Sequence, residues 1–509
     1  MMRKSYLLAA GLALLFSACQ KENPDEPGSP ANQDPMTRSE INAAVRAKIE
    51  QSNAVYNWKD ADDRMLWSAA LLGDSLLAIG YKPANQGEIK DKIHLINVDS
   101  DPWKNARNKV ISKVIELTER LHPGMKPAEK DLLFEADKVL PILEMKVFDR
   151  EVIAGLREMP EVRYLEPLGY TPEELNYRSE SGCGVSPASS INAADYATIS
   201  PNVKVTWNFY NMNIPGAWST STGSGITIAL IDTGTSPDQN KLGSQFNSGQ
   251  SSGRFIDRQG TYVSSWWPWA SPDGPDDQCG HGTQMAGLLA APRGSGGATV
   301  GVAYNANLLA IRATGDVVVN GSSEKKGVKN ALIIAGGRSD VKVISMSLGD
   351  IFWSDTVADG VYYAYNHGKM IFAAAGTSTS FTNWWGVIFP AYMPETVAVT
   401  GVKDGATLQR CNVCHSGSEV DFVAVMQRAS NNNRTALTLA MSGNQPSTVG
   451  GSSAATAITA GIAALVWSTN PGQTRNQVLN RLKNASQFYP SRDSEFGWGL
   501  IDAQQAVNN

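Results

Sequence analysis

Continuous apolar runs alternate with segments of helical spacing along the C-terminal part of the chain. From about residue 203 onward, the predicted strands are uninterrupted apolar runs, and runs buried on both faces are typical of parallel sheets. These strands are 226–231, 308–311, 341–344, 370–375 and 396–399. The helices predicted between them are 284–291, 327–336 and 355–367. The alternation predicts an α/β doubly wound parallel sheet over residues 203–509, with functional groups at the carboxyl ends of strands.

A second alternating pattern precedes this region. Residues 39–90 are predicted to be a helical N-terminal extension with Ser39 as its N-cap. Residues 91–168 follow the order β-α-β-β-α-β, which predicts a ferredoxin-like α+β domain. Its predicted strands are 93–98, 132–134, 139–147 and 162–166, and its predicted helices are 103–121 and 150–159. The polar stretch 169–202 is predicted to be a linker.

The first residues carry the pattern of an export signal. A short basic start precedes an apolar run at 7–16, which is too short to cross a membrane and is typical of a signal peptide. Residues 17–19, Ser-Ala-Cys, are similar to a bacterial lipobox. This similarity implies a signal peptide at 1–18 and a lipid on Cys19 that anchors the protein to the outer membrane or cell surface; an ordinary secretion signal is the alternative. The segment 19–38 is predicted to be a disordered tether.

The net charge bears on the class of partner that we expect, and the cysteine content bears on disulfide and metal binding. The net charge is −5, from 44 basic and 49 acidic residues, and no long basic run occurs, so a nucleic-acid partner is not expected. Besides Cys19 there are four cysteines, an even number for an oxidising compartment, and the sequence does not choose among their three pairings. Cys411-x-x-Cys414-His415 could form half of a zinc site, but no second such pair occurs, which favours a disulfide or two free thiols.

Three short segments carry candidate chemistry. Asp232 closes a predicted strand in Ile-Asp-Thr-Gly, where a carboxylate can orient an imidazole. His281 lies between glycines at a predicted helix start, and an imidazole can accept and return a proton. Ser453 opens an Ala-rich predicted helix, whose N-terminal N–H groups can stabilise an oxyanion.

Each segment also has another interpretation. Asp-Thr-Gly is the catalytic triplet of pepsin-like proteases, but these need two carboxylates that share a proton, and the chain has one such triplet in α/β surroundings. A lone histidine is commonly structural. A serine at a helix start is usually an N-cap.

The order of the segments separates these interpretations. Asp232, His281 and Ser453 follow one another along the chain, and their segments resemble the three catalytic blocks of the subtilisin-like serine proteases. The resemblance covers about 205–509. It implies that Ser453 is the nucleophile of an acyl-transfer reaction, His281 its base, and Asp232 the carboxylate that orients His281.

The resemblance also implies a precursor. Residues 139–166 resemble part of the inhibitory propeptide of these proteases, so 91–168 is expected to inhibit the enzyme and assist its folding. Self-cleavage is then expected within 170–183. The implied partners are protein or peptide substrates, the protein's own propeptide and, through the lipid on Cys19, a membrane.

Further site residues follow from the same resemblance. Where the family usually has the Asn of the oxyanion hole, this chain has Thr377. Either the Thr377 hydroxyl donates the hydrogen bond in place of the Asn, or the side chain of Ser378 or Asn383 donates it, or the enzyme is slow. The pocket for the residue before the cleaved bond would be walled by two uncharged stretches that favour apolar or aromatic side chains. They are Ser347-Leu348-Gly349 and Ala374-Ala375-Gly376.

The sequence assigns no cofactor. An acidic loop could bind structural calcium, as loops of this family often do, but a solvated acidic turn is the favoured interpretation. Its carboxylates are Asp273, Asp276 and Asp277.

The predicted function is a secreted serine endopeptidase made as a self-inhibited precursor. A second hypothesis is a surface binding protein on a catalytically impaired scaffold. It is supported by Thr377 and by Ser452, Ala454 and Ala457, where the family usually has Thr, Met and Pro. A third hypothesis, an aspartic protease, is disfavoured by the single Asp-Thr-Gly triplet.

Overall fold

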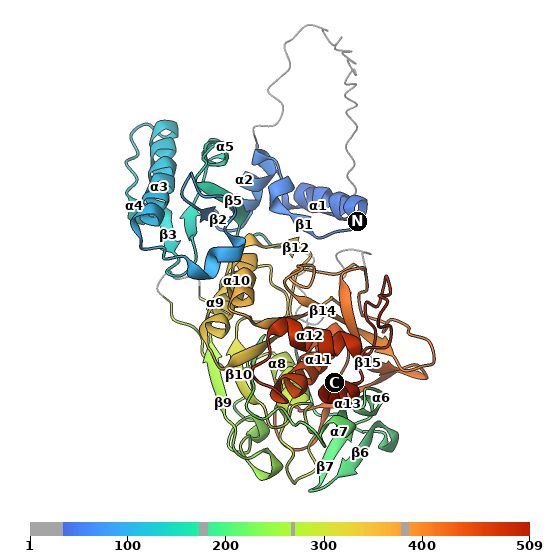
Figure 1. Ribbon diagram of the computed structural model, residues 1–509. Helices are drawn as coiled ribbons and strands as arrows, with labels where there is room; N and C mark the ends of the chain where they lie inside the picture. The colour runs from blue at the N-terminus through green and yellow to red at the C-terminus, as the bar shows by residue number, and fades with distance from the viewer. Residues whose placement is uncertain (1–33, 173–181, 266–269, 378–385) are drawn as a thin grey trace, which may run out of the picture. The chain divides into compact units, whose positions relative to one another are not determined.

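The computed structural model describes residues 34–172, 182–265, 270–377 and 386–509 (Figure 1). By their contacts, residues 36–509 form one unit and residues 1–35 another. Cys19 and the predicted signal peptide lie outside the described residues, and so do Ser378 and Asn383.

A nine-stranded sheet forms the centre of the C-terminal region, in the order β17-β16-β15-β14-β13-β11-β8-β10-β9. The pairs from β15 to β9 are parallel, and β16 and β17 are added antiparallel at one edge. The strands are β8 (Thr227–Asp232), β9 (Ile256–Gly260), β10 (Asn307–Arg312), β11 (Val341–Met346), β13 (Met370–Ala374), β14 (Val397–Lys403), β15 (Val420–Arg428), β16 (Asn431–Thr438) and β17 (Ser447–Val449). The predicted parallel α/β sheet is confirmed, because its apolar runs are buried on both faces.

Helices cover both faces of this sheet. They are α8 (His281–Ala290), α9 (Ser322–Gly337), α10 (Asp355–Asn366), α11 (Gly451–Ser468), α12 (Arg475–Asn484) and α13 (Ala503–Asn508). Strand β8 supplies side chains to two cores: Ile228 and Leu230 join the core with α8 and α11, whereas Ala229 and Ile231 join the core with α9 and α10. This alternation holds the strand in place from both sides.

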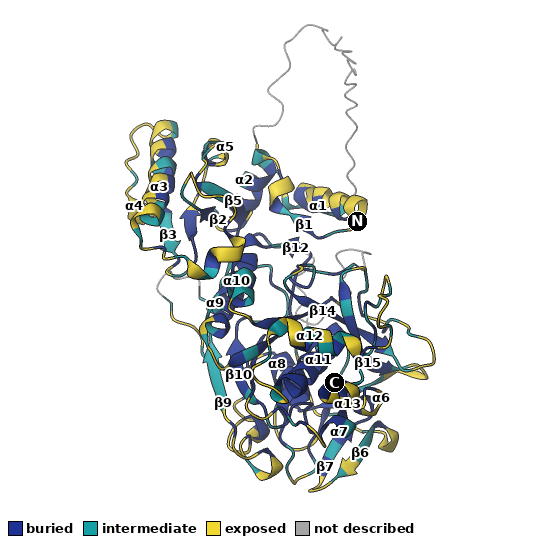
Figure 2. Cartoon of the chain, in the orientation of Figure 1, coloured by how far each residue is buried: buried dark blue, intermediate teal, exposed yellow. Residues whose placement is uncertain are grey.

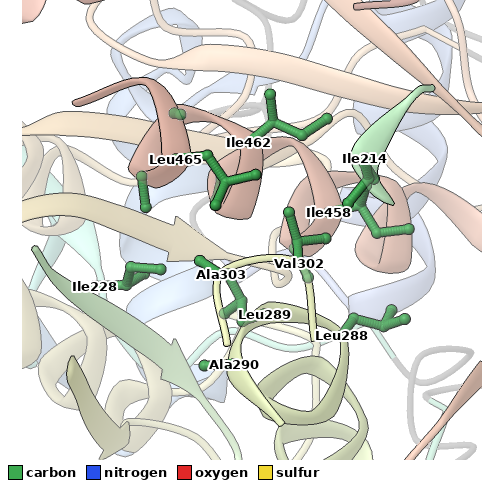
Figure 3. Close-up of a cluster of buried hydrophobic side chains, with 14 of the residues drawn as sticks. Ile214, Ile228, Leu288, Leu289, Ala290, Val302, Ala303, Ile458, Ile462 and Leu465 are labelled. Carbon is green, nitrogen blue, oxygen red and sulfur yellow. The ribbon is translucent and has the colours of Figure 1, made fainter. Parts of the chain in front are cut away.

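Helix α11 is the most buried of the long helices (Figure 2). Figure 3 shows its side chains Ile458, Ile462 and Leu465 in the cluster that also holds Val302 and Leu288. By length and composition α11 could cross a membrane, but 89% of it is buried inside the protein, as expected of a core helix. Its N-terminal turn, which carries Ser453, is therefore rigidly placed.

The N-terminal part contains a second sheet, in the order β3-β4-β2-β5, with antiparallel pairs. Its elements are β2 (Leu76–Tyr81), α3 (Asp101–Leu121), α4 (Glu129–Leu132), β3 (Leu133–Ala136), β4 (Ile142–Lys146), α5 (Arg150–Arg157) and β5 (Val162–Pro167). Apart from the short α4, the order is β-α-β-β-α-β, so the ferredoxin-like α+β prediction is confirmed. We call residues 76–168 the α+β domain.

The predicted first strand of this domain is wrong. Residues 90–95 form a 3₁₀ helix in which Leu95 is 73% exposed, and the first strand is instead β2. Strand β2 is an apolar run paired on both sides, and both of its faces are buried: Leu77 and Ile79 face the domain's own core, and Leu76 and Ala78 join the cluster shared with α10. A fully buried strand does not alternate, so its pattern resembles that of a buried helix. The α+β domain thus begins at Leu76 instead of residue 91.

The N-terminal extension is helical only in part. It contains α1 (Arg38–Ser52), β1 (Tyr56–Asn57) and α2 (Asp63–Leu72). The N-cap of α1 is Thr37 and not Ser39, because Thr37 and Glu40 satisfy each other's backbone N–H groups in a capping box. The remaining short elements are β6 (Tyr196–Ile199), β7 (Val203–Thr206), α6 (Asn208–Asn211), α7 (Ile214–Ala217) and β12 (Phe352–Trp353).

Candidate active site

Asp232 and His281 form a buried pair at the carboxyl edge of the central sheet. Asp232 is the last residue of β8, and His281 is the first residue of α8. Asp232 Oδ1 lies 2.8 Å from His281 Nδ1, and the two residues are 1% and 4% exposed. A carboxylate in this position holds the ring and stabilises its protonated form, which leaves Nε2 for proton transfer.

Asp277 fixes the loop that leads into His281. Its carboxylate accepts hydrogen bonds from the backbone N–H groups of Cys279 (2.9 Å) and Gly280 (2.7 Å), and from the N–H and hydroxyl of Thr283 (2.9 and 2.6 Å). Gly280 has a φ of +98°, which a residue with a side chain rarely adopts. Asp277 is therefore a positioning residue for His281, a role that sequence reasoning missed because most of its partners are backbone N–H groups.

The three carboxylates of the acidic loop have partners among the described residues. Asp277 accepts hydrogen bonds from the loop before His281, Asp276 forms an ion pair with Arg258 at 2.9 Å, and Asp273 lies 3.7 Å from Arg312. No group of three His, Cys, Asp or Glu side chains in the described ranges could hold a metal ion. Arginine side chains and N–H donors thus bind the carboxylate oxygens that the sequence suggested as ligands of a cation.

Ser453 lies at the same edge of the sheet. Its Oγ donates to the Ser347 carbonyl at 3.4 Å, and Ser347 Oγ donates to the Ser453 carbonyl at 2.9 Å. Ser347 directly follows β11, which pairs with β8 so that Met346 is opposite Ile231, the residue before Asp232. The three candidate residues therefore lie near two adjacent strand ends. Within the described chain, the Ser453 hydroxyl bonds to the Ser347 carbonyl and not to His281.

Hydrogen bonds connect the segment that contains Thr377 to Ser452, the residue before Ser453. Ser452 Oγ donates to the Gly376 carbonyl at 2.9 Å and accepts from the Gly376 N–H at 3.2 Å. Thr377 Oγ1 lies 3.4 Å from Ser452 Oγ. The hydroxyl of Thr377 is thus beside the N-terminus of α11, where an oxyanion would develop.

We expect Thr377→Val, which keeps the shape but removes the hydroxyl, to lower kcat for peptide hydrolysis about 10²- to 10³-fold, the usual effect of losing one oxyanion donor. Thr377→Ser retains a hydroxyl and is expected to keep most of the activity. Steady-state kinetics on a peptide substrate provide the measurement. Equal kcat for the valine variant and the wild type would show that Thr377 is not a donor.

The two predicted pocket walls both flank Ser452 and Ser453. Leu348 and Ala374 are 2% and 3% exposed. The outer end of the first wall is already paired: Gly349 N–H donates to the Val317 carbonyl at 3.0 Å, and its carbonyl accepts from the Val319 N–H at 3.1 Å. A peptide that pairs with this wall is therefore restricted to the stretch before Gly349.

The residue after Gly349, Asp350, is buried, and burial raises the pKa of its carboxyl to about 7.

Two disulfides settle the cysteine pairing. Cys183 is bonded to Cys279, and Cys411 to Cys414. The zinc alternative for Cys411 and Cys414 is excluded by their bond to each other. Of the two favoured outcomes, a disulfide or two free thiols, the structure has the disulfide. The Cys183–Cys279 bond joins the predicted linker to the loop before His281.

The pKa of His281 is raised. Burial lowers this pKa, but the charge and hydrogen bond of Asp232 and the charge of Asp277 raise it more, so it lies above the ordinary value of 6.5. A general base acts in its neutral form, so kcat/KM is expected to increase with pH through a midpoint above 6.5. A pH–rate profile measures this midpoint, and a value below 6.5 would contradict the raised pKa.

A parallel α/β sheet with an Asp–His pair and a helix-start serine at its carboxyl edge defines the subtilisin-like class of serine-protease folds. The model of the family described as "Subtilase family" matches residues 223–499, more than half of the 509-residue chain. The chain belongs to the subtilase family.

Individual relatives agree with this assignment. The alkaline protease of Alkalihalobacillus alcalophilus is 28% identical over 374 residues, 72% of this chain and 87% of the relative. Subtilisin Savinase of Lederbergia lenta is 30% identical over 310 residues, 60% of this chain and 98% of the relative. Among solved structures, fervidolysin from Fervidobacterium pennivorans matches with a TM-score of 0.58 at 18% identity, over 86% of this chain and 61% of that chain. This last match supports the fold alone.

Proposed function

We propose that the protein is a serine endopeptidase that cleaves peptide bonds with Asp232, His281 and Ser453 as its catalytic triad. The observation that carries this proposal is the buried 2.8 Å contact between Asp232 and His281, at the edge where Ser453 begins α11. Three groups of the required chemistry, brought from distant parts of the chain to two adjacent strand ends, support a shared reaction.

The reaction would run by acyl transfer. His281 Nε2 takes the proton of the Ser453 hydroxyl as its oxygen attacks the peptide carbonyl carbon. The tetrahedral oxyanion is held by the Ser453 N–H and the Thr377 hydroxyl. The imidazolium then gives its proton to the leaving amine, and water releases the acyl group by the same steps in reverse.

A direct test combines hydrolysis and inhibition. The purified protein is expected to cleave a fluorogenic peptide with an apolar residue before the scissile bond and to lose this activity with a fluorophosphonate. No hydrolysis and no fluorophosphonate labelling of mature protein would favour the binding-protein hypothesis, and inhibition by pepstatin would favour an aspartic protease.

We also propose that the α+β domain is the enzyme's inhibitory propeptide. It contacts α9 and α10 through buried charges. Arg163 makes two hydrogen bonds to Asp359, at 2.7 and 2.8 Å. Glu166 accepts from the N–H and hydroxyl of Thr356 at 2.9 Å, in the first turn of α10, and forms an ion pair with Lys325 at 3.2 Å. Carboxylates are favourable at helix N-termini, so this contact supports docking of the domain on the protease.

Breaking the Arg163–Asp359 contact should weaken inhibition. Arg163→Ala leaves the Asp359 carboxylate, 2% exposed, without its charged partner, a loss of about 3–5 kcal/mol for a buried pair. We expect the unprocessed precursor to hydrolyse a small peptide at least about tenfold faster. Lys113→Ala is the control, because Lys113 pairs with Glu116 within α3. Equal precursor activity in the wild type and Arg163→Ala would argue against inhibition through this interface.

Export and anchoring complete the proposal. A lipid on Cys19 would hold the precursor at the membrane, and a cut in the linker would separate the protease from this anchor unless the propeptide stays bound. Mass spectrometry of membrane and medium fractions tests this, with a processed form expected among the products. Finding only intact, anchored and inactive chain would refute the processing proposal.

A further inference from the structure

A short segment of the linker lies directly beside His281. We call residues Gly182–Ala188 the strap. Cys183 of the strap is disulfide-bonded to Cys279, two positions before His281 in the chain. The Gly184 N–H donates to the Cys279 carbonyl at 2.9 Å, and a Cβ placed on Gly182 would lie 3.2 Å from His281 Cδ2. The strap backbone is thus in contact range of the ring edge that includes Nε2.

The other end of the strap reaches the segment that leads to Ser453. The Ala188 N–H donates to the Pro446 carbonyl at 2.9 Å, and the Gln445 side chain donates to the Ala188 carbonyl at 3.2 Å. Between these ends, Val185 packs where Gly280 has no side chain: a Cβ there would lie 2.6 Å from Val185 Cβ. The strap therefore connects the loop before His281 with the approach to β17 and α11.

The disulfide is the covalent restraint on this segment. Gly182, Gly184, Ser186 and Pro187 are exposed, so the strap buries little apolar surface. A chain end of this kind is normally poorly ordered. A cut before Cys183 would create such an end, but a covalent bond to Cys279 would keep it at the active site.

We propose that the strap is a disulfide-held wall of the substrate cleft, which remains beside His281 after processing and limits the size of the substrates that reach Ser453. This inference rests on the proposed protease function and adds a specificity determinant to it. Reduction by a dithiol would open the wall: the reductant gives up two electrons and two protons and becomes a disulfide, while Cys183 and Cys279 become thiols.

The test compares large and small substrates in mature protein. In the double variant Cys183→Ser/Cys279→Ser, KM for a denatured protein substrate is expected to fall at least about fivefold more than KM for a small apolar amino-acid ester. Mild dithiol treatment of the wild type, with the opened bond identified by alkylation and mass spectrometry, should reproduce this change without any mutation. The same treatment of the double variant is the control for effects of the second disulfide.

The outcomes separate this inference from the function on which it rests. If the ester is still turned over but KM for the large substrate is unchanged after the disulfide is opened by mutation or by reduction, the strap proposal is overturned. The protease proposal would then still stand. Absence of ester turnover and of fluorophosphonate labelling in both wild type and variant would overturn the protease proposal, and the strap proposal with it.

Discussion

Ser453→Ala is expected to abolish peptide hydrolysis, with a fall in kcat of about 10⁶-fold, the size of effect known for removing the triad serine from subtilisin. The reason is chemical: without the hydroxyl there is no nucleophile to form the acyl-enzyme, and only binding and the oxyanion site remain. The change removes one oxygen from a partly buried position in α11, so the fold should be retained.

The control for this variant is Ser468→Ala. Ser468 is at the far end of the same helix, where its hydroxyl bonds to the Leu465 carbonyl at 2.9 Å. It is expected to keep wild-type kcat. Full activity in Ser453→Ala would place the nucleophile elsewhere.

Asp232→Asn is expected to lower kcat about 10⁴-fold, the cost of presenting the wrong imidazole tautomer to the nucleophile. An amide that donates to His281 Nδ1 would move the ring proton to Nε2, where it blocks acceptance of the Ser453 proton. The substitution also removes the negative charge that raises the pKa of His281, so the remaining activity should have a more acidic pH midpoint.

Asp238→Asn is the matched control, because Asp238 is exposed on the loop after β8. It should change neither kcat nor the pH midpoint. Loss of activity in Asp232→Asn without any shift of the pH profile would mean that the carboxylate does not act through His281.

The central sheet was predictable from sequence because burial on both faces leaves a local signature. The run 228–231 is apolar without interruption up to Asp232, and the neighbouring strands are mostly apolar. The glycines around His281 were equally informative, since Gly280 takes a left-handed conformation that a side chain would strain.

Features that depend on distant partners could not be predicted in this way. Strand β2 has two paired neighbours, β4 and β5, and both are more than 60 residues away along the chain; only this pairing distinguishes β2 from a buried helix. For Asp277 the sequence offered a solvated acidic turn or a calcium site, because an acidic loop does not reveal that its oxygens will meet backbone N–H groups. The sequence does not distinguish among the three possible pairings of four cysteines, and only the fold brings Cys183 close to Cys279.

The most direct test of the account is to label the active protein with a fluorophosphonate and to locate the modified residue by peptide mapping. The account predicts a single adduct on Ser453, formed in proportion to the activity lost. An adduct on another residue, or complete loss of activity with Ser453 unmodified, would contradict it.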